Sequence, residues 1–298
     1  MRCICCLSNK ITPNPFNLDG FFCCYDCGFI FKPNNKLHNQ EAQLIHHYEN
    51  VDPHVTVANS KRPFFNFVLN HLPAPVNKNN SILDVGCGYG YFLVMADKRG
   101  WQTAGVEIVK EAVQSARKIL GENNIFHGTL KEAFFPDNAF DVVTLWDVLV
   151  FVEDPFEELK KCYQTLRIGG KIGIRIRNVT FQIMVYTAFL PFKKIAARFG
   201  IKNPYVFHRN CFSHKSIYRL LIRLGFTRIQ ITNSPITYGD PYGYFNIKGL
   251  AKLAKYFISI ISKIFFWLSS GRWLIGPSIL VWGEKPQSDP EKQTNKFG

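Results

Sequence analysis

The sequence lacks several features that would each point to a different class of protein. No apolar run reaches the ~18–20 uninterrupted residues of a membrane-spanning helix, so we expect no spanning segment. The first residues lead into cysteines and not into an apolar stretch, which argues against a secretory signal peptide. We therefore expect a cytoplasmic globular protein.

Acidic residues are scarce in the second half of the chain. Residues 171–298 hold 4 Asp and Glu against 20 Lys and Arg, a net charge of +16, whereas residues 1–170 carry −2. An excess of this size favours contact with phosphate, in nucleic acid, at an anionic membrane surface or on a phosphorylated substrate. The basic half is also strongly apolar, which favours lipid over nucleic acid.

Six of the nine cysteines lie in the first 27 residues. Two C-x-x-C pairs, Cys3/Cys6 and Cys24/Cys27, are separated by 17 residues, a spacing typical of a zinc site. Four thiolates suit a closed structural Zn²⁺ site, so we predict a zinc-ribbon-like module over residues 1–33. A disulfide pair or a redox dithiol is the alternative, and Cys5 or Cys23 is a possible substitute ligand.

Strands and helices alternate from residue 79 onward, after a helical connector over 34–78 with helices near 40–50 and 61–71. Repeated strand–helix units predict an α/β fold, a doubly wound and mostly parallel seven-stranded sheet spanning 79–284, followed by a disordered tail over 285–298. The expected strands are 81–85, 103–107, 124–127, 141–146, 171–177, 227–232 and 278–282, and the expected helices are 91–99, 110–120, 155–166 and 213–224.

A glycine-rich turn follows the first of these strands. Asp84 ends the strand, and Gly86, Gly88 and Gly90 follow at alternate positions, where they allow a ligand to approach the backbone closely. A dinucleotide fingerprint needs its third glycine one place later, where this chain has Tyr91, so the turn suits a cofactor without a pyrophosphate. Glu107 ends the next strand and is placed to accept both hydroxyls of a ribose.

Residues 79–178 resemble a class I S-adenosylmethionine-dependent methyltransferase domain of the ubiquinone-biosynthesis-like group. The resemblance rests on the glycine turn, on Glu107, on the segment 140–149 and on the Gly-Gly turn at 169–170. It implies that the following residues bind S-adenosylmethionine: Asp84 toward the methionine amino group, Gly86, Cys87, Gly88 and Gly90 along the methionine, Glu107 at the ribose, Thr129 and Leu130 at the adenine, and Trp146 and Asp147 near the methyl group.

The chain departs from this family after the fourth strand. Relatives often carry Leu-Glu-His there, whereas this chain reads Leu149-Val150-Phe151. Methyl transfer relies on positioning, with a base only to remove the proton of the nucleophile, so the departure affects the identity of the base. His208, just before the helix 213–224, is our candidate for it.

Two basic, apolar insertions, near 179–207 and 234–276, interrupt the regular pattern and should cover the substrate site. Residues 250–268 suit either a membrane-interface helix or a buried lid helix with snorkelling lysines. We expect a small-molecule methyltransferase whose acceptor is a saccharide, lipid-linked or isoprenoid-like compound, amphiphilic or phosphorylated, with peripheral association to an anionic membrane. The alternatives are a ribosomal RNA methyltransferase with a zinc module and a non-catalytic partner protein that binds the cofactor.

Overall fold

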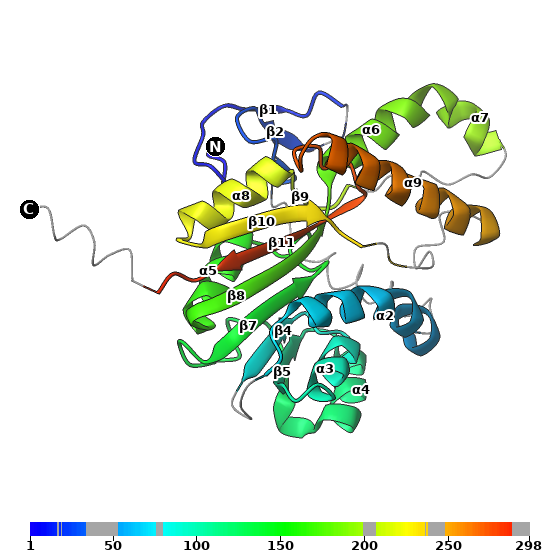
Figure 1. Ribbon diagram of the computed structural model, residues 1–298. Coiled ribbons are helices and arrows are strands. Elements are labelled where there is room, and N and C mark those ends of the chain that lie inside the picture. Colours follow the sequence, from blue (N-terminus) through cyan, green and yellow to red (C-terminus); the bar gives the residue numbers. More distant parts are fainter. Residues whose placement is uncertain are drawn as a thin grey trace, which may run out of the picture.

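The computed structural model describes residues 1–16, 18, 20–33, 53–75, 80–198, 207–235, 237 and 248–287. The helix expected near 40–50 and residues 288–298 of the expected tail lie outside these ranges. Figure 1 shows a large twisted sheet with helices on both faces and a small sheet near the N-terminus. The doubly wound α/β fold is therefore confirmed.

Seven strands form the large sheet, and the five consecutive strands at one side of it run parallel. The sheet order is β10 (Thr227–Asn233), β11 (Ser278–Glu284), β8 (Leu166–Arg177), β7 (Phe140–Trp146), β4 (Ser81–Val85), β5 (Gln102–Glu107) and β6 (Ile125–His127). β11 pairs antiparallel with β8, and β10 pairs antiparallel with β11.

Side chains of the central strands alternate between two buried faces. Ile82 and Val142 pack on one side, and their neighbours Leu83 and Val143 pack on the other, which is why these strands are apolar at consecutive positions. The first face carries α2 (Pro53–His71), α3 (Tyr91–Asp97) and α4 (Lys110–Leu120), which leads into the short helix η2 (Glu122–Asn124). The second carries α5 (Pro155–Thr165) and α8 (His214–Arg223).

One strand begins earlier than the sequence pattern indicates. The Gly169-Gly170 turn suggests a strand that begins at residue 171, but β8 begins at Leu166. Leu166 already pairs with Phe140 of β7, and the Gly169 N–H donates to the Lys285 carbonyl at 2.9 Å. Tertiary pairing on both sides therefore extends the strand through glycines that by themselves favour a turn.

A small four-stranded sheet joins the N-terminal residues to the rest of the chain (Figure 1). Its order is β1 (Ile11–Pro13), β2 (Phe22–Cys24), β3 (Ile30–Phe31) and β9 (Asn210–Cys211), so its last strand comes from just before α8. Ser213, the N-cap of α8, also donates its hydroxyl to the Cys27 carbonyl at 2.7 Å. The cysteine-rich segment is thus built onto the segment that contains His208.

The two insertions form helices beside the end of the large sheet (Figure 1). The first contains α6 (Val179–Phe189), η3 (Leu190–Phe192) and α7 (Lys193–Arg198), and the second contains α9 (Lys248–Leu268). Asn178, the N-cap of α6, donates to the carbonyls of Leu274 and Gly276, so the two insertions are tied together. Within the described ranges, no helix combines the length and the apolar character needed to cross a membrane.

Candidate active site

The carboxyl edge of the parallel strands gathers most of the residues that the sequence singles out. Asp84 lies in β4, Glu107 ends β5 and Trp146 ends β7, while Thr129 and Leu130 follow β6. Because β6, β5, β4 and β7 are neighbours in the sheet, these positions form one row along one edge. Ligands of open α/β sheets bind at this edge.

The three glycines of the turn adopt conformations that other residues rarely reach. Gly86, Gly88 and Gly90 have φ values of +69°, +55° and +75°. A Cβ atom at Gly86 would lie 2.4 Å from a methyl carbon of Val148, and one at Gly90 would lie 3.1 Å from the Cβ of Ala116. Two of the glycines are therefore required for packing as well as for backbone geometry.

Glu107 fixes the glycine turn to the end of β5. Its carboxylate accepts the N–H groups of Gly88 at 2.8 Å, Ile108 at 2.9 Å and Val109 at 3.0 Å. The side chain is 5% exposed, and this burial raises its pKa despite the three N–H donors. The Gly86 and Cys87 N–H groups donate to the Val106 carbonyl, so the turn has a defined shape without a ligand.

Asp84 is a buried carboxyl with one hydroxyl donor. The Thr144 hydroxyl donates to its Oδ1 at 2.7 Å, and only 2% of the residue is exposed. Burial raises its pKa to about 7, although the Thr144 hydroxyl and the charge of Lys61 both act to lower it. A carboxyl held in this way is stabilised by a cationic ligand, which is what an amino group of a cofactor provides.

Thr129 and Leu130 differ in their surroundings. Thr129 is exposed, and both its N–H and its hydroxyl donate to Glu132 at 2.8 Å. Leu130 is buried in the core next to the sheet. The structure thus places both at the carboxyl end of β6, with an apolar side chain beneath an exposed turn.

Trp146 ends β7 and Asp147 follows it, in an aromatic and charged environment. The Trp146 ring packs edge-on against Phe64 of α2 at 5.2 Å, and its buried Nε1 has no hydrogen-bond partner among the described residues. Asp147 pairs with Arg175 of β8 at 2.5 Å and with Lys61 of α2 at 3.1 Å. Burial alone would raise the pKa of Asp147, but the charges of Arg175 and Lys61 outweigh it and lower the pKa to about 2.

Sequence reasoning missed Lys61, Arg175 and Thr144, each of which contacts a predicted site residue. Arg175 is 7% exposed and also donates through Nε to the Ser234 hydroxyl at 3.0 Å. A threonine within the apolar run of β7, and an arginine between two isoleucines in β8, are the signals that could have found two of them. Lys61 carried no such signal, because a lysine on a helix is ordinarily a solvated residue.

His208 lies against the position where the chain departs from its family. Its ring contacts the Phe151 ring edge-on, with 4.7 Å between the centroids. The same segment is fixed to the loop after β7, because the Asn210 side chain donates to the Val152 carbonyl at 2.7 Å. The structure therefore brings together two sites 57 residues apart, the missing Leu-Glu-His position and the candidate base.

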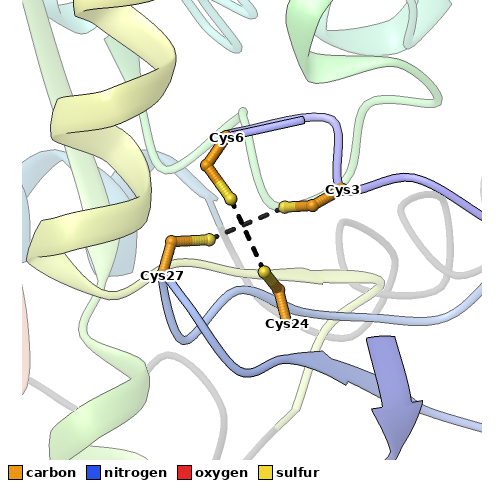
Figure 2. Close-up of side chains that lie close together, drawn as sticks. All are labelled: Cys3, Cys6, Cys24 and Cys27. Carbon is orange, nitrogen blue, oxygen red and sulfur yellow. Dashed lines mark hydrogen bonds between the residues drawn. The ribbon is translucent and has the colours of Figure 1, made fainter. Parts of the chain in front are cut away.

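The four paired cysteines point toward a common centre (Figure 2). The Sγ atoms of Cys3 and Cys27, and those of Cys6 and Cys24, are 3.6 Å apart, and all four lie within 4.8 Å of one another. Tetrahedral coordination with Zn–S bonds of ~2.3 Å places sulfur atoms about 3.8 Å apart. The cluster thus matches the donor set and spacing of a tetrahedral metal site, and none of the nine cysteines, all in described ranges, forms a disulfide.

A seven-stranded sheet of this order, with a glycine turn and two buried carboxyls at its carboxyl edge, defines the Rossmann-like S-adenosylmethionine-dependent methyltransferases. A family model described as a methyltransferase domain matches residues 59–231, more than half of the chain, and the chain therefore belongs to that family.

Several known proteins are similar to parts of this chain. The ubiquinone biosynthesis O-methyltransferase of Idiomarina loihiensis is 33% identical over 117 residues, covering 38% of this chain and 47% of the relative. The demethylmenaquinone methyltransferase of Listeria welshimeri is 30% identical over 106 residues, covering 33% of this chain and 45% of the relative. The chain thus spans about half the length of the curated relatives it matches.

Solved structures show the same fold at low identity. A methyltransferase from Thermotoga maritima, described as a possible histamine N-methyltransferase, gives a TM-score of 0.53 at 18% identity, over 84% of this chain and 100% of the other. The geranyl diphosphate C-methyltransferase of Streptomyces coelicolor gives 0.51 at 15% identity, over 86% and 90%.

Proposed function

We propose that this methyltransferase acts on an amphiphilic small molecule that carries an anionic group, within the class of saccharide, lipid-linked or isoprenoid-like acceptors. The observation that carries this proposal is the cationic cluster at the ends of β7 and β8. Lys61 and Arg175 pair with the carboxylate of Asp147, and the charges of Arg175, Lys61 and Arg177 lower its pKa. Clustered cations in a partly buried site attract a phosphate or carboxylate of a substrate.

The proposal assigns a role in binding S-adenosylmethionine to each residue that the sequence predicts to contact this cofactor. S-adenosylmethionine, when bound, supplies a methyl group on a sulfonium centre. Glu107 accepts the ribose hydroxyls, and Asp84 holds the amino group of the methionine part. The turn of Gly86, Cys87, Gly88 and Gly90 follows the methionine, and Thr129 with Leu130 borders the adenine.

On the acceptor side, Trp146 and Asp147 form the wall beside the methyl group. His208 accepts the proton of the nucleophile, a role supported by its contact with Phe151 in the loop after β7. A base contributes roughly 10²- to 10⁴-fold to such a step, so His208→Gln should lower kcat by that order and leave S-adenosylmethionine affinity unchanged. An equal loss of cofactor affinity would instead indicate a structural role.

We further propose that the four-cysteine cluster binds a structural Zn²⁺ through Cys3, Cys6, Cys24 and Cys27. The metal would then stabilise the small sheet that holds the segment before α8. A closed set of four thiolates leaves no open position for catalysis, so the role is structural and not chemical.

The nature of the acceptor is supported by one structural neighbour. The protein from Streptomyces coelicolor, which shares the fold, is a C-methyltransferase whose structure contains geranyl diphosphate, an apolar chain with an anionic head. A fold of this kind can therefore accommodate such a molecule, although the likeness itself extends only to the fold.

Methyl transfer from labelled cofactor tests the proposal directly. The purified chain is incubated with labelled S-adenosylmethionine and either a lipid extract or ribosomal RNA. We expect label in the lipid fraction, lost in the His208→Gln variant. Label in RNA, or a salt-sensitive complex with RNA, would favour the RNA methyltransferase alternative and refute the proposed acceptor class.

A further inference from the structure

The longest helix in the described part of the chain, α9, exposes an apolar face. In α9, Phe257, Ile261, Ile264 and Leu268 recur at the spacing of one helix face, and all four are exposed. The opposite face holds Ser262, which is 3% exposed and whose carbonyl accepts from Asn233 of β10. The helix therefore packs through Ser262 and the partly buried Phe266, and it presents most of its other large apolar residues outward.

Exposed large apolar residues also occur on the first insertion and just after α9, and Figure 1 shows the helices of both insertions beside the same end of the large sheet. Thirteen of the twenty-two exposed large hydrophobic residues in the described chain lie on α6–α7, on α9 or just after it. We call this set the α6–α9 face; it comprises Met184, Leu190, Phe192, Ile195, Tyr256, Phe257, Ile260, Ile261, Ile264, Phe265, Trp267, Leu268 and Trp273. Apolar residues concentrated in this way mark a site of interaction.

The charges on the same segments are all of one sign. Residues 179–198 and 248–276 contain eight Lys and Arg and no Asp or Glu. Lys193, Lys194, Lys263 and Arg272 are exposed beside the apolar residues, and Trp267 is 79% exposed. An amphipathic helix with a broad apolar face, flanking lysines and exposed tryptophans is typical of segments that lie in the interface of an anionic bilayer.

The face also lies close to the candidate active site. Asn233 contacts α9, and the next residue, Ser234, accepts a hydrogen bond from Arg175 of the cationic cluster. A surface that docks here would therefore lie next to the edge where the acceptor is expected.

From this geometry and charge we propose that the α6–α9 face docks on an anionic lipid bilayer, so that the enzyme takes its acceptor from the membrane surface. The docking follows from the exposed residues alone, whereas delivery of the acceptor rests on the proposed function. The exposure of residues 256–268 thus favours a membrane-interface helix over a buried lid for that part of the expected segment 250–268.

Sedimentation with vesicles tests the docking. We expect the zinc-loaded chain to bind vesicles of phosphatidylcholine with phosphatidylglycerol and to bind phosphatidylcholine alone much more weakly. The double variant Ile261→Glu/Ile264→Glu should lower partitioning more than tenfold, because two apolar side chains no longer enter the interface. Removing charge in Lys193→Gln/Lys194→Gln should lower binding to the anionic vesicles by about fivefold per residue.

A matched control replaces two exposed isoleucines by glutamate outside the α6–α9 face. Ile168 and Ile222 are also exposed isoleucines, at 60% and 49%, but they lie outside the α6–α9 face. Ile168→Glu/Ile222→Glu should bind vesicles like the parent chain. This control and the Ile261→Glu/Ile264→Glu variant should both bind S-adenosylmethionine with the parent affinity.

Three outcomes would overturn the docking: no binding of the parent to anionic vesicles, an equal loss in the control variant, or a parent dimer in light scattering that Ile261→Glu/Ile264→Glu converts to a monomer. The last would make the face a surface for a second copy of the chain. Vesicle binding without any S-adenosylmethionine binding would leave the docking supported and refute the proposed function.

Discussion

Replacing Asp84 by Asn removes a charge from a site where burial makes the charge costly. Burial raises the pKa of Asp84 from an ordinary 3.8 to about 7. A shift of this size corresponds to on the order of 4 kcal/mol of cost for the ionised form. Because the folded pKa is above the unfolded one, the stability linked to this group is present below pH ~4 and is lost as the pH rises toward 7.

Asp84→Asn should therefore stabilise the ligand-free protein at high pH. The amide is nearly isosteric and keeps an oxygen to accept the Thr144 hydroxyl. We expect the free energy of unfolding in urea to exceed that of the parent by on the order of 4 kcal/mol near pH 8.5, where the parent carries the buried charge. The difference should vanish near pH 4.

Cofactor binding should change in the opposite direction. Loss of the carboxylate should weaken S-adenosylmethionine binding by roughly 10- to 100-fold, the range for a hydrogen bond to a charged group. In the parent, binding near pH 7 should release a proton from Asp84, so the calorimetric heat should depend on the ionisation enthalpy of the buffer. This dependence should disappear in the variant.

Thr144→Val serves as the control, because it removes the donor that lowers the pKa of Asp84 and leaves the carboxyl in place. It should shift the loss of stability to higher pH. If Asp84→Asn were less stable than the parent at both pH values and bound S-adenosylmethionine normally, Asp84 would be an ordinary structural acceptor and the reasoning would be wrong.

Three further predictions concern the turn, the ribose site and the cysteines. Gly86→Ala should lower the free energy of unfolding by about 2–4 kcal/mol in urea, because of its positive φ and the contact with Val148; a change under about 0.5 kcal/mol would contradict the packing argument. Glu107→Gln should weaken S-adenosylmethionine binding roughly 10- to 100-fold in calorimetry, and unchanged affinity would exclude a ribose contact. Cys24→Ser should abolish the single zinc equivalent in elemental analysis and lower Tm, whereas Cys23→Ser should keep both; equal zinc in the two variants would refute the ligand assignment.

The fold and the class of cofactor could be predicted from local sequence patterns. Strands that are apolar at consecutive positions, separated by amphipathic helices, predicted the parallel sheet, and the structure confirms it. The glycine spacing after Asp84 was readable because positive φ angles restrict those positions to one residue type. Cys3, Cys6, Cys24 and Cys27 were readable because short C-x-x-C spacings place two sulfur atoms near one point.

The ion-pair network around Asp147 could not be predicted from the sequence, because it joins residues that are distant in sequence. Lys61 meets Asp147 only when α2 packs over the end of β7, and Arg175 meets it only because β8 is its neighbour in the sheet. In the same way, the pairing of β3 with β9 brings the cysteine module to the segment that contains His208.

By itself, then, the sequence determined most strands and helices around the large sheet, the glycine turn with Asp84 and Glu107, and the four cysteines of the C-x-x-C pairs, because each depends on a local residue pattern or on a backbone angle. It did not determine the early start of β8 or the strands of the small sheet. Tertiary structure alone decided that Asp147 is neutralised by Arg175 and Lys61, that Phe151 contacts His208, and that α9 presents its apolar face outward. The burial of a side chain and the charges around it depend on which helices and strands pack against each other. The residue type at one position does not specify that packing.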